Sequence, residues 1–333
     1  MILWYFTLLK SARRDGGVHL YTPTVSALAF APASIGNVAV GFDVLGQSAA
    51  VAGDRVRATR TAARGVRIAE ITGIVRDLPR DPARNTASVA VASMADALGL
   101  DHGFDLSIDK GIPLASGLGG SAASAVAAVV AAGALLDAPI DPLRLLAFAA
   151  AGETVASGAP HLDNIAASLF GGLVLVTGLD RPSVTRIPVP EAIRTVLVHP
   201  HIELSTRAAR KILASTVSLR DVVRQQANMA GVVTGCFTSD LGLIRASLED
   251  VLIEPQRKRL IPGFDRVKEA AMTAGALGCS IAGAGPTMFA WCEAFNAEAV
   301  RRGMTRGFEA EGLGADSWIA PADDSGARVI ERS

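Results

Sequence analysis

A glycine-rich loop followed by an uncharged run of small residues offers the clearest chemistry in this 333-residue chain. Residues 113–124 read PLASGLGGSAAS, and the run Ser121 to Leu136 consists mainly of helix-forming residues. The first turn of a helix has N–H groups without an intrahelical partner, and the helix dipole is positive there, so both attract an anion. Glycine also lets a phosphate approach the backbone closely. The pattern predicts a phosphate site, and we expect the phosphate of a nucleotide.

This loop differs from two other phosphate-binding motifs. A P-loop requires a Gly-Lys pair, and none occurs in the sequence. The segment Gly117 to Ala122 fits the loose dinucleotide pattern G-x-G-x-x-A, but the strand-like stretch Phe104 to Ile108 ends well before it and Pro113 intervenes. A nicotinamide-dependent oxidoreductase is therefore the weaker alternative. A tight turn with a packing helix and no ligand is the structural alternative.

Charge and composition narrow the class of protein. Lys plus Arg and Asp plus Glu number 32 each, and aromatic residues make up 5%, so a basic or aromatic surface for nucleic acid is not expected. Cys236, Cys279 and Cys292 form no C-x-x-C pair, which favours reduced, buried thiols. We expect a soluble cytoplasmic protein (or a plastid protein in a plant, although no transit peptide is evident). Neither nucleic acid nor membrane is an expected partner, and the sequence allows a homodimer.

The length suggests about two domains. The apolar stretch Met1 to Leu9 precedes its basic residues, which is the reverse of a signal peptide, and it is too short to span a bilayer. We therefore expect residues 1–26 to form an extension of unassigned role. The glycines and prolines between Thr177 and Pro190 indicate a junction between a first domain, 27–180, and a second, 181–333.

The hydrophobic pattern predicts an α+β fold without strict βαβ repetition. Alternation predicts strands at Ala27–Ala33, Arg55–Thr61, Phe104–Ile108, Gly172–Val176 and Thr195–His199. Helical periodicity predicts helices at Thr86–Leu98, Ser121–Leu136, Pro142–Ser157, Ser205–Leu213, Leu219–Cys236, Leu241–Leu248 and Gly263–Ala276.

Two further clusters carry polar side chains near glycines. Asn37 and Asp43 bracket a loop that is suited to a small polar ligand, or else to Asx capping of a turn. Glu153 lies in a mostly apolar helical stretch, where a carboxylate is costly unless it is paired, exposed or bound to a metal. With the Ser121 hydroxyl it would supply the hard oxygen ligands that Mg²⁺ prefers, and a solvated helix face is the alternative.

A third cluster is a sharp turn. Gly283, Gly285 and Pro286 lie between two apolar stretches. The turn predicts either an ordinary hairpin or a second backbone wall beside a bound substrate or nucleotide.

Together these segments resemble the GHMP family of small-molecule kinases, whose three signatures occur in order at residues 32–43, 113–124 and 283–287. Three more segments resemble the homoserine kinases of that family. They are HLDN at 161–164 leading into FGG at 170–172, STRAAR at 205–210, and EPQR at 254–257 leading into LIPGF at 260–264. The resemblance covers roughly residues 27–293.

The resemblance implies a two-domain fold and a reaction. The N-terminal domain would be ribosomal-protein-S5-domain-2-like and bind ATP, and the C-terminal domain would be ferredoxin-like. The implied reaction is transfer of a phosphoryl group from ATP, with Mg²⁺, to the hydroxyl of L-homoserine, giving O-phospho-L-homoserine in threonine biosynthesis. Another GHMP kinase acting on a mevalonate-type or sugar alcohol, and a ligand sensor that has lost turnover, are alternatives.

Roles for single residues also follow from the resemblance. The ATP phosphates would contact Pro113, Ser116, Gly117, Leu118, Gly119, Gly120, Ser121, Ala122 and Ser124. Asn85 would contact the adenine, while Ser121 and Glu153 would hold Mg²⁺. The homoserine end would meet Asn37, Asp43, Asn164, Arg210, Arg257 and Gly285. Among these, Asp43 would pair with the ammonium, Asn164 would bond the attacking hydroxyl, and the two arginines would clamp the carboxylate.

Departures from the family pattern fall at Gly36, Ala39, Gly120 and Leu162, and they leave the polar positions intact. Asn164 stands where mevalonate kinases have an aspartate, and an amide cannot act as a general base. Asp163 is adjacent, but we expect it to project in a different direction. The sequence therefore favours catalysis by Asn164, Glu153 and Ser121 without a strong side-chain base, with positioning and charge neutralisation providing most of the rate.

Overall fold

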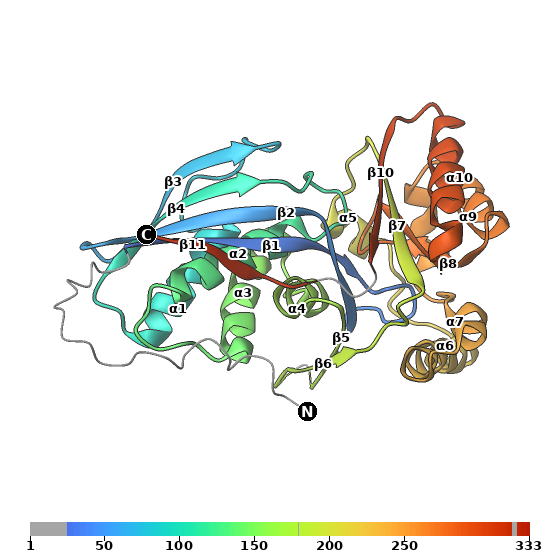
Figure 1. The fold of residues 1–333 in the computed structure, drawn as a ribbon, viewed down its shortest axis with the longest axis horizontal. Coiled ribbons are helices and arrows are strands. Elements are labelled where there is room, and N and C mark those ends of the chain that lie inside the picture. Colours follow the sequence, from blue (N-terminus) through green and yellow to red (C-terminus); the bar gives the residue numbers. More distant parts are fainter. Residues whose placement is uncertain (1–24, 179, 322–324) are drawn as a thin grey trace, which may run out of the picture.

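The computed structural model describes residues 25–178, 180–321 and 325–333, and it contains two sheets with helices on their faces (Figure 1). The expected N-terminal extension, except residues 25 and 26, lies outside the described residues. The first sheet has the order β11-β1-β2-β4-β3, with β5 pairing to both β2 and β6. Its strands are β1 (Ser26–Gly36), β2 (Leu45–Thr61), β3 (Gly65–Gly73), β4 (Gly103–Lys110), β5 (Leu173–Thr177), β6 (Ser183–Ile187) and β11 (Arg328–Arg332).

Four helices cover one face of the first sheet (Figure 1). They are α1 (Thr86–Leu98), α2 (Gly120–Gly133), α3 (Pro142–Ser157) and α4 (Leu162–Phe170). The alanine-rich α2 is buried along most of its length and contacts β1, β2 and three neighbouring helices, because its small side chains permit close approach on every side. Asn85 begins α1, since its side chain accepts the Ala87 N–H, and Gly99 ends it in the left-handed conformation.

The second sheet has the order β10-β7-β9-β8. Its strands are β7 (Ile193–Pro200), β8 (Ala276–Ile281), β9 (Met288–Glu293) and β10 (Ala315–Pro321). The helices of this half are α5 (Thr206–Lys211), α6 (Leu219–Thr238), α7 (Leu241–Ser247), α8 (Glu254–Arg257), α9 (Phe264–Thr273) and α10 (Ala297–Glu309), with short 3₁₀ turns η1 (Lys258–Leu260) and η2 (Ala294–Asn296). Figure 1 places α9 and α10 at the outer end of the molecule, far from α1.

The α+β class is confirmed, and the chain crosses between its halves more than once. The expected boundary after residue 180 falls between β5 and β6, which pair with each other. The last strand, β11, returns to pair with β1. Residues 181–333 therefore contribute two strands to the first sheet.

A buried polar link joins the two sheets. The Trp291 indole N–H donates to the Gln47 side-chain oxygen at 2.9 Å, and the Gln47 amide donates to the Thr195 hydroxyl at 2.8 Å. All three residues are fully buried, and the largest hydrophobic cluster includes residues of both halves. The two halves therefore pack as one body, which lets a site between them keep a fixed geometry.

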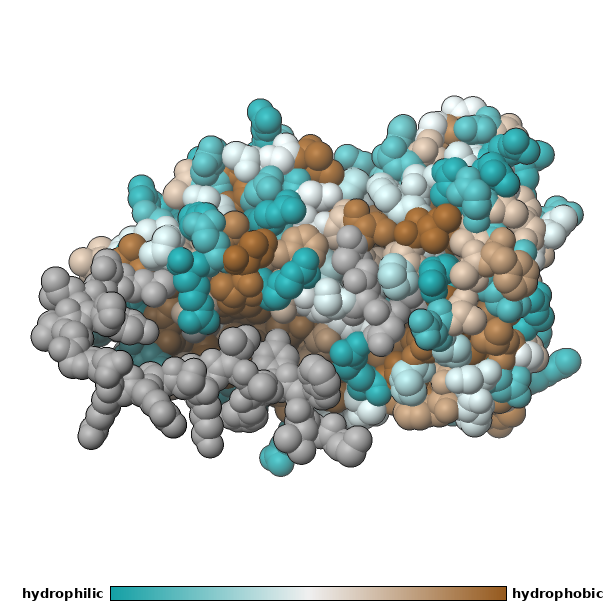
Figure 2. All heavy atoms as spheres, in the orientation of Figure 1, coloured by the Kyte–Doolittle hydropathy of each residue, from teal (hydrophilic) through white to brown (hydrophobic). Residues whose placement is uncertain are grey.

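On the face seen in Figure 2, hydrophilic and hydrophobic residues are interspersed. Among the residues the structure describes, no helix has the length and hydropathy needed to cross a bilayer.

Candidate active site

A cavity of about 750 Å³ lies where segments of both halves meet. It is lined by the loop before α2, the segment between β1 and β2, the α3–α4 junction, α5, α8 and the β8–β9 turn. The predicted site residues that line it are Asn37, Asp43, Asn85, Pro113, Ser116, Gly117, Gly119, Gly120, Ser121, Ser124, Glu153, Asn164, Arg210 and Arg257. Leu118 and Ala122 instead belong to the hydrophobic core, and Gly285 faces Ile261 and Ile281.

The glycine-rich loop leads directly into the N-terminus of α2, as predicted. Gly117 and Gly119 have positive φ angles of 80° and 65°. A Cβ atom on Gly119 would lie 2.1 Å from the Ser34 hydroxyl, and one on Gly117 would lie 2.6 Å from the Ala282 carbonyl oxygen. Only glycine fits both positions. The loop thus presents backbone N–H groups at the positive end of a buried helix, an arrangement that favours an anion.

A buried lysine lies beneath this loop. Lys110, the last residue of β4, pairs with Asp54 of β2 and donates to the Gly120 carbonyl and the Ser124 hydroxyl at 2.8 and 2.9 Å. Asp54 also accepts the Ser124 hydroxyl at 2.6 Å and the N–H of Gly111 at 3.1 Å. The network ties the start of α2 to the sheet at the cavity wall, and Asp54 balances the charge of Lys110. No motif in the sequence indicated a role for Lys110.

The β8–β9 turn is a hairpin that also forms part of the cavity wall, and the contact with a ligand stays a prediction. Strands β8 and β9 pair antiparallel, and Gly283 and Ala284 line the cavity. The Thr287 hydroxyl donates to the Ser116 carbonyl at 2.7 Å and accepts from His199 Nδ1 at 3.0 Å. Burial lowers the pKa of His199, which favours the neutral ring. The turn therefore holds the glycine-rich loop from the second half of the chain.

Both candidate arginines converge on one aromatic ring. The guanidinium carbons of Arg210 and Arg257 each lie 5.3 Å from the centre of the Phe42 ring. Arg210 Nη2 contacts the two Asp43 carboxylate oxygens at 2.7 and 2.9 Å. Arg257 is 3% exposed and donates to the carbonyls of Ala209 and Gly283, both at 3.1 Å. Burial and the nearby Arg210 lower the pKa of Arg257, while the carboxylates of Asp43, Asp250 and Asp163 act in the opposite direction.

Asp43 is held by its own loop. Its N–H donates to the Asn37 side-chain oxygen at 3.0 Å, and the Asn37 amide donates to the Gly283 carbonyl at 2.8 Å. Asn37 has a left-handed φ of 71°, which asparagine tolerates better than most residues. The Asn37 side chain therefore closes its loop across six residues, rather than capping a local Asx turn, and Asp43 lines the cavity.

Glu153 is 3% exposed, so a solvated helix face is the wrong interpretation. Its Oε1 lies 3.1 Å from His161 Nδ1 in the cavity wall. Burial opposes protonation of His161, but the hydrogen bond and the charge of Glu153 outweigh it and raise the pKa of this histidine. His161 is a cavity residue that sequence analysis left without a role. Its place beside Asp163 and Asn164 in one motif was the available signal.

Asp163 and Asn164 both reach the cavity, so the expectation that they project apart is wrong. The Asn164 amide donates to Asp163 Oδ1 at 3.2 Å, and its oxygen accepts the Ser34 hydroxyl at 3.0 Å. Asp163 Oδ2 accepts the Asn37 N–H at 3.1 Å. Burial and the charge of Asp43 raise the pKa of Asp163 to about 6. A carboxylate of altered acidity thus lies directly beside the predicted hydroxyl-binding amide.

The oxygen donors at the cavity are compatible with a divalent cation that takes most of its ligands from the substrate and from water. Ser121 and Glu153 both line the cavity and offer hard oxygens. Within the described residues, no group of three or more His, Cys, Asp or Glu side chains forms a metal cage. Mg²⁺ commonly takes one or two protein oxygens and completes its shell with phosphate oxygens and water.

Asn85 has a structural task at the cavity wall. Its side-chain oxygen accepts the Ala87 N–H at 3.0 Å, and its amide donates to the Pro79 carbonyl at 2.9 Å. These bonds hold the start of α1 and the preceding loop at the cavity.

Known proteins match this chain over most of its length. Family models of the GHMP kinases N terminal domain and the GHMP kinases C terminal match residues 85–172 and 232–310. The chain is 48% identical to homoserine kinase from Xylella fastidiosa (strain M12) over 96% of this chain and 99% of the relative. It is 43% identical to homoserine kinase from Chlorobium phaeovibrioides over 92% and 99%.

Solved structures show the same fold. The crystal structure of homoserine kinase from Cytophaga hutchinsonii superposes with a TM-score of 0.89 at 41% identity, covering 94% of this chain and 100% of that chain. L. major mevalonate kinase in complex with R-mevalonate shares the fold at a TM-score of 0.65 and 16% identity, covering 90% and 98%. On the sequence matches and the fold together, this chain belongs to the GHMP kinases, in their homoserine kinase family.

Proposed function

We infer that this protein transfers the γ-phosphoryl group of ATP to the hydroxyl of L-homoserine, giving O-phospho-L-homoserine. One observation carries the inference beyond family membership. The same cavity presents the amides of a helix N-terminus and, from the other half of the chain, two guanidinium groups on one aromatic ring. The first feature suits a triphosphate and the second suits the carboxylate of an amino acid.

The nucleotide phosphates would occupy the loop from Ser116 to Ser121. Backbone N–H groups there and the α2 dipole would neutralise negative charge that develops as the phosphoryl group leaves ADP, and Lys110 would hold the start of α2 in place. Ser121 and Glu153 are the residues that would hold Mg²⁺, which supplies further charge neutralisation on the phosphate oxygens when bound.

The amino-acid substrate would take over the ionic contacts that Asp43 and Arg210 make with each other. Asp43 and Arg210 neutralise each other without a ligand. A zwitterionic substrate offers an ammonium to Asp43 and a carboxylate to Arg210, so each side chain can replace one ionic partner by another. Arg257, held by two backbone carbonyls, would complete the carboxylate clamp. This arrangement favours an amino acid over a neutral sugar alcohol.

The attacking hydroxyl would lie against Asn164, which orients it. We retain the hypothesis that no strong side-chain base is needed, because the transition state of phosphoryl transfer is loose and the proton can leave late to phosphate or water. The competing mechanism has Asp163 as the general base, since a carboxylate with a pKa of about 6 can accept a proton near neutral pH. The kcat of Asp163→Asn separates the two mechanisms: a modest change supports the hypothesis, and a loss of about 10²-fold or more contradicts it.

The test is a coupled assay of ADP release with Mg²⁺ and ATP, run in parallel with L-homoserine, mevalonate and galactose, with the phosphorylated product identified by ³¹P NMR. We expect turnover with L-homoserine and little with the other two alcohols. Turnover with mevalonate or galactose alone would contradict the substrate assignment, and nucleotide binding without turnover would indicate a sensor.

A further inference from the structure

The one-turn helix α8 connects the cavity to a partly buried ion pair outside it. Its last residue, Arg257, lines the cavity, while its first, Glu254, does not. A single helical turn has almost no intrinsic stability, so its orientation must come from tertiary contacts. The contacts that fix the orientation of α8 also fix the position of the Arg257 guanidinium.

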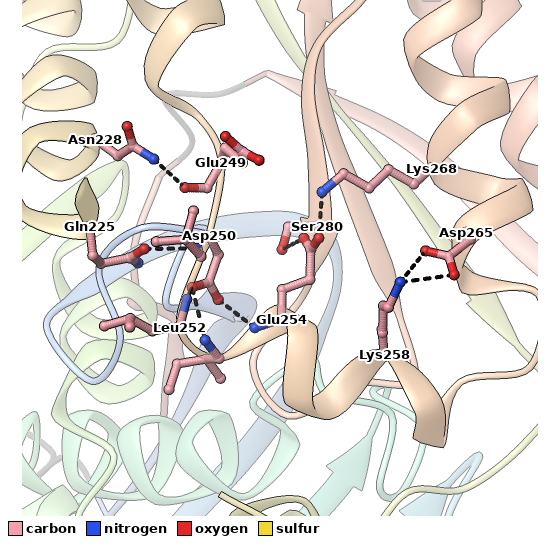
Figure 3. Close-up of polar contacts among 12 residues, drawn as sticks. Gln225, Asn228, Glu249, Asp250, Leu252, Glu254, Lys258, Asp265, Lys268 and Ser280 are labelled. Carbon is pink, nitrogen blue, oxygen red and sulfur yellow. Dashed lines mark hydrogen bonds and ion pairs between the residues drawn. The ribbon is translucent and has the colours of Figure 1, made fainter. Parts of the chain in front are cut away.

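Glu254 makes two strong contacts with separate elements (Figure 3). Its Oε2 accepts the hydroxyl of Ser280 in β8 at 2.6 Å, and its Oε1 pairs with Lys268 of α9. Glu254 is 7% exposed, and its burial raises its pKa, against the influence of Lys268 and Ser280. A carboxylate removed from water in this way is costly, and both partners are needed to offset that cost.

The start of α8 is also held. Asp250 accepts the N–H groups of Leu252, Ile253 and Glu254 at 2.8 to 3.0 Å, and Gln225 of α6 accepts the N–H of Val251 at 2.9 Å (Figure 3). The segment before α8 is therefore pinned at its backbone. These contacts do not by themselves fix the orientation of the α8 helical turn.

Two contacts spaced by three residues on both α8 and the β8–β9 segment fix that orientation. Glu254 holds Ser280, and three residues later Arg257 donates to the carbonyl of Gly283, which follows Ser280 by three residues. The helix is thus attached at both ends to β8 and the cavity turn that follows it. Arg257 sits close to another cation, Arg210, and has a lowered pKa, so its inward position needs such attachment.

We propose that Glu254 is a positioning residue, which through Ser280 and Lys268 orients α8 so that Arg257 faces the substrate carboxylate. The proposal rests on the role of Arg257 inferred above. A nearby ion pair, Lys258 with Asp265, joins the same segment to α9 but has side chains 40% and 76% exposed. Exposed pairs contribute little, so this pair does not fix the turn.

The experiment compares steady-state kinetics for both substrates in Glu254→Ala and Glu254→Gln, with thermal melting to verify folding. We expect Glu254→Ala to raise the KM for L-homoserine about tenfold and to change the KM for ATP less than about twofold, because misplacing a binding group is costly only where it binds. Glu254→Gln keeps an acceptor for Ser280 and should raise the homoserine KM only about threefold.

Two controls separate positioning from general destabilisation. Asp265→Asn breaks the neighbouring exposed pair, and Val300→Ala removes buried volume in α10, away from α8. Both should leave the homoserine KM within about twofold of wild type, although Val300→Ala lowers the melting temperature. If Glu254→Ala does not fold, Ser280→Ala and Lys268→Met each remove one contact and should each raise the homoserine KM.

Arg257→Met distinguishes the possible failures. If Arg257→Met leaves the homoserine KM unchanged, the role inferred for Arg257 is wrong. If Arg257→Met raises that KM but Glu254→Ala does not, the positioning proposal is overturned. The same holds if Glu254→Ala does not fold and neither Ser280→Ala nor Lys268→Met raises that KM. An equal rise in both KM values in Glu254→Ala and in Val300→Ala would also overturn it, because the effect would then be one of stability.

Discussion

Replacing Asp163 by asparagine should change how the stability of the fold depends on pH. The ordinary pKa of an aspartate, 3.8, is raised to about 6 for Asp163. The folded protein therefore binds this proton more tightly than the unfolded chain does. The favourable contribution is complete below pH 3.8 and is lost as the pH rises through about 6. The difference between these two pKa values corresponds to about 3 kcal/mol.

Urea denaturation of wild type and Asp163→Asn between pH 4.5 and 8 measures this effect. The free energy of unfolding of the variant, relative to wild type, should increase with pH and gain about 2 kcal/mol between pH 4.5 and 8, because part of the titration lies below pH 4.5. Ser168→Ala on the same helix removes a buried hydrogen bond to the Pro32 carbonyl but no titrating group, so its difference from wild type should be independent of pH. A flat profile for Asp163→Asn would refute the raised pKa.

Three other substitutions test separate parts of the structure. Arg210→Ala should raise the homoserine KM by about 10- to 100-fold and change ATP affinity little, since a charge-assisted hydrogen bond contributes about 1.5–3 kcal/mol. An equal loss of ATP affinity, measured by titration calorimetry, would contradict the place of Arg210 at the amino-acid end. Lys110→Met leaves the buried carboxylate of Asp54 without its cation and should cost about 3–5 kcal/mol in denaturant unfolding, whereas an unchanged midpoint would show that the pair is not important for the fold. Gln47→Leu deprives the Trp291 N–H of its acceptor and should cost about 1–3 kcal/mol, and the double variant with Trp291→Phe should lose less than the sum of the two single changes.

Local sequence signals were sufficient for the glycine-rich loop and several helices. The ends of α1 and α3 match the prediction because each has a capping residue before it and a left-handed glycine after it, Asn85 and Gly99 for α1, Asp141 and Gly158 for α3. The strand expected at Arg55–Thr61 is the second part of the longer β2. Helix α10 was missed although Val300, Met304 and Phe308 recur at a helical interval.

Contacts set by strand pairing could not be predicted from sequence. Asp54 and Lys110 are far apart in the chain, and they meet because β2 and β4 pair with Arg55 opposite Asp109. The pairing of Asp43 with Arg210 likewise depends on how the two halves dock. Their residue types indicated ligand chemistry, but their mutual contact is a property of the tertiary structure.

The most direct test of the site is a crystal structure with a non-hydrolysable ATP analogue, Mg²⁺ and L-homoserine. We predict the β- and γ-phosphates against the amides between Gly117 and Ser121, and the homoserine carboxylate between Arg210 and Arg257. A nucleotide bound elsewhere with this loop vacant, or homoserine bound away from the two guanidinium groups, would contradict the account.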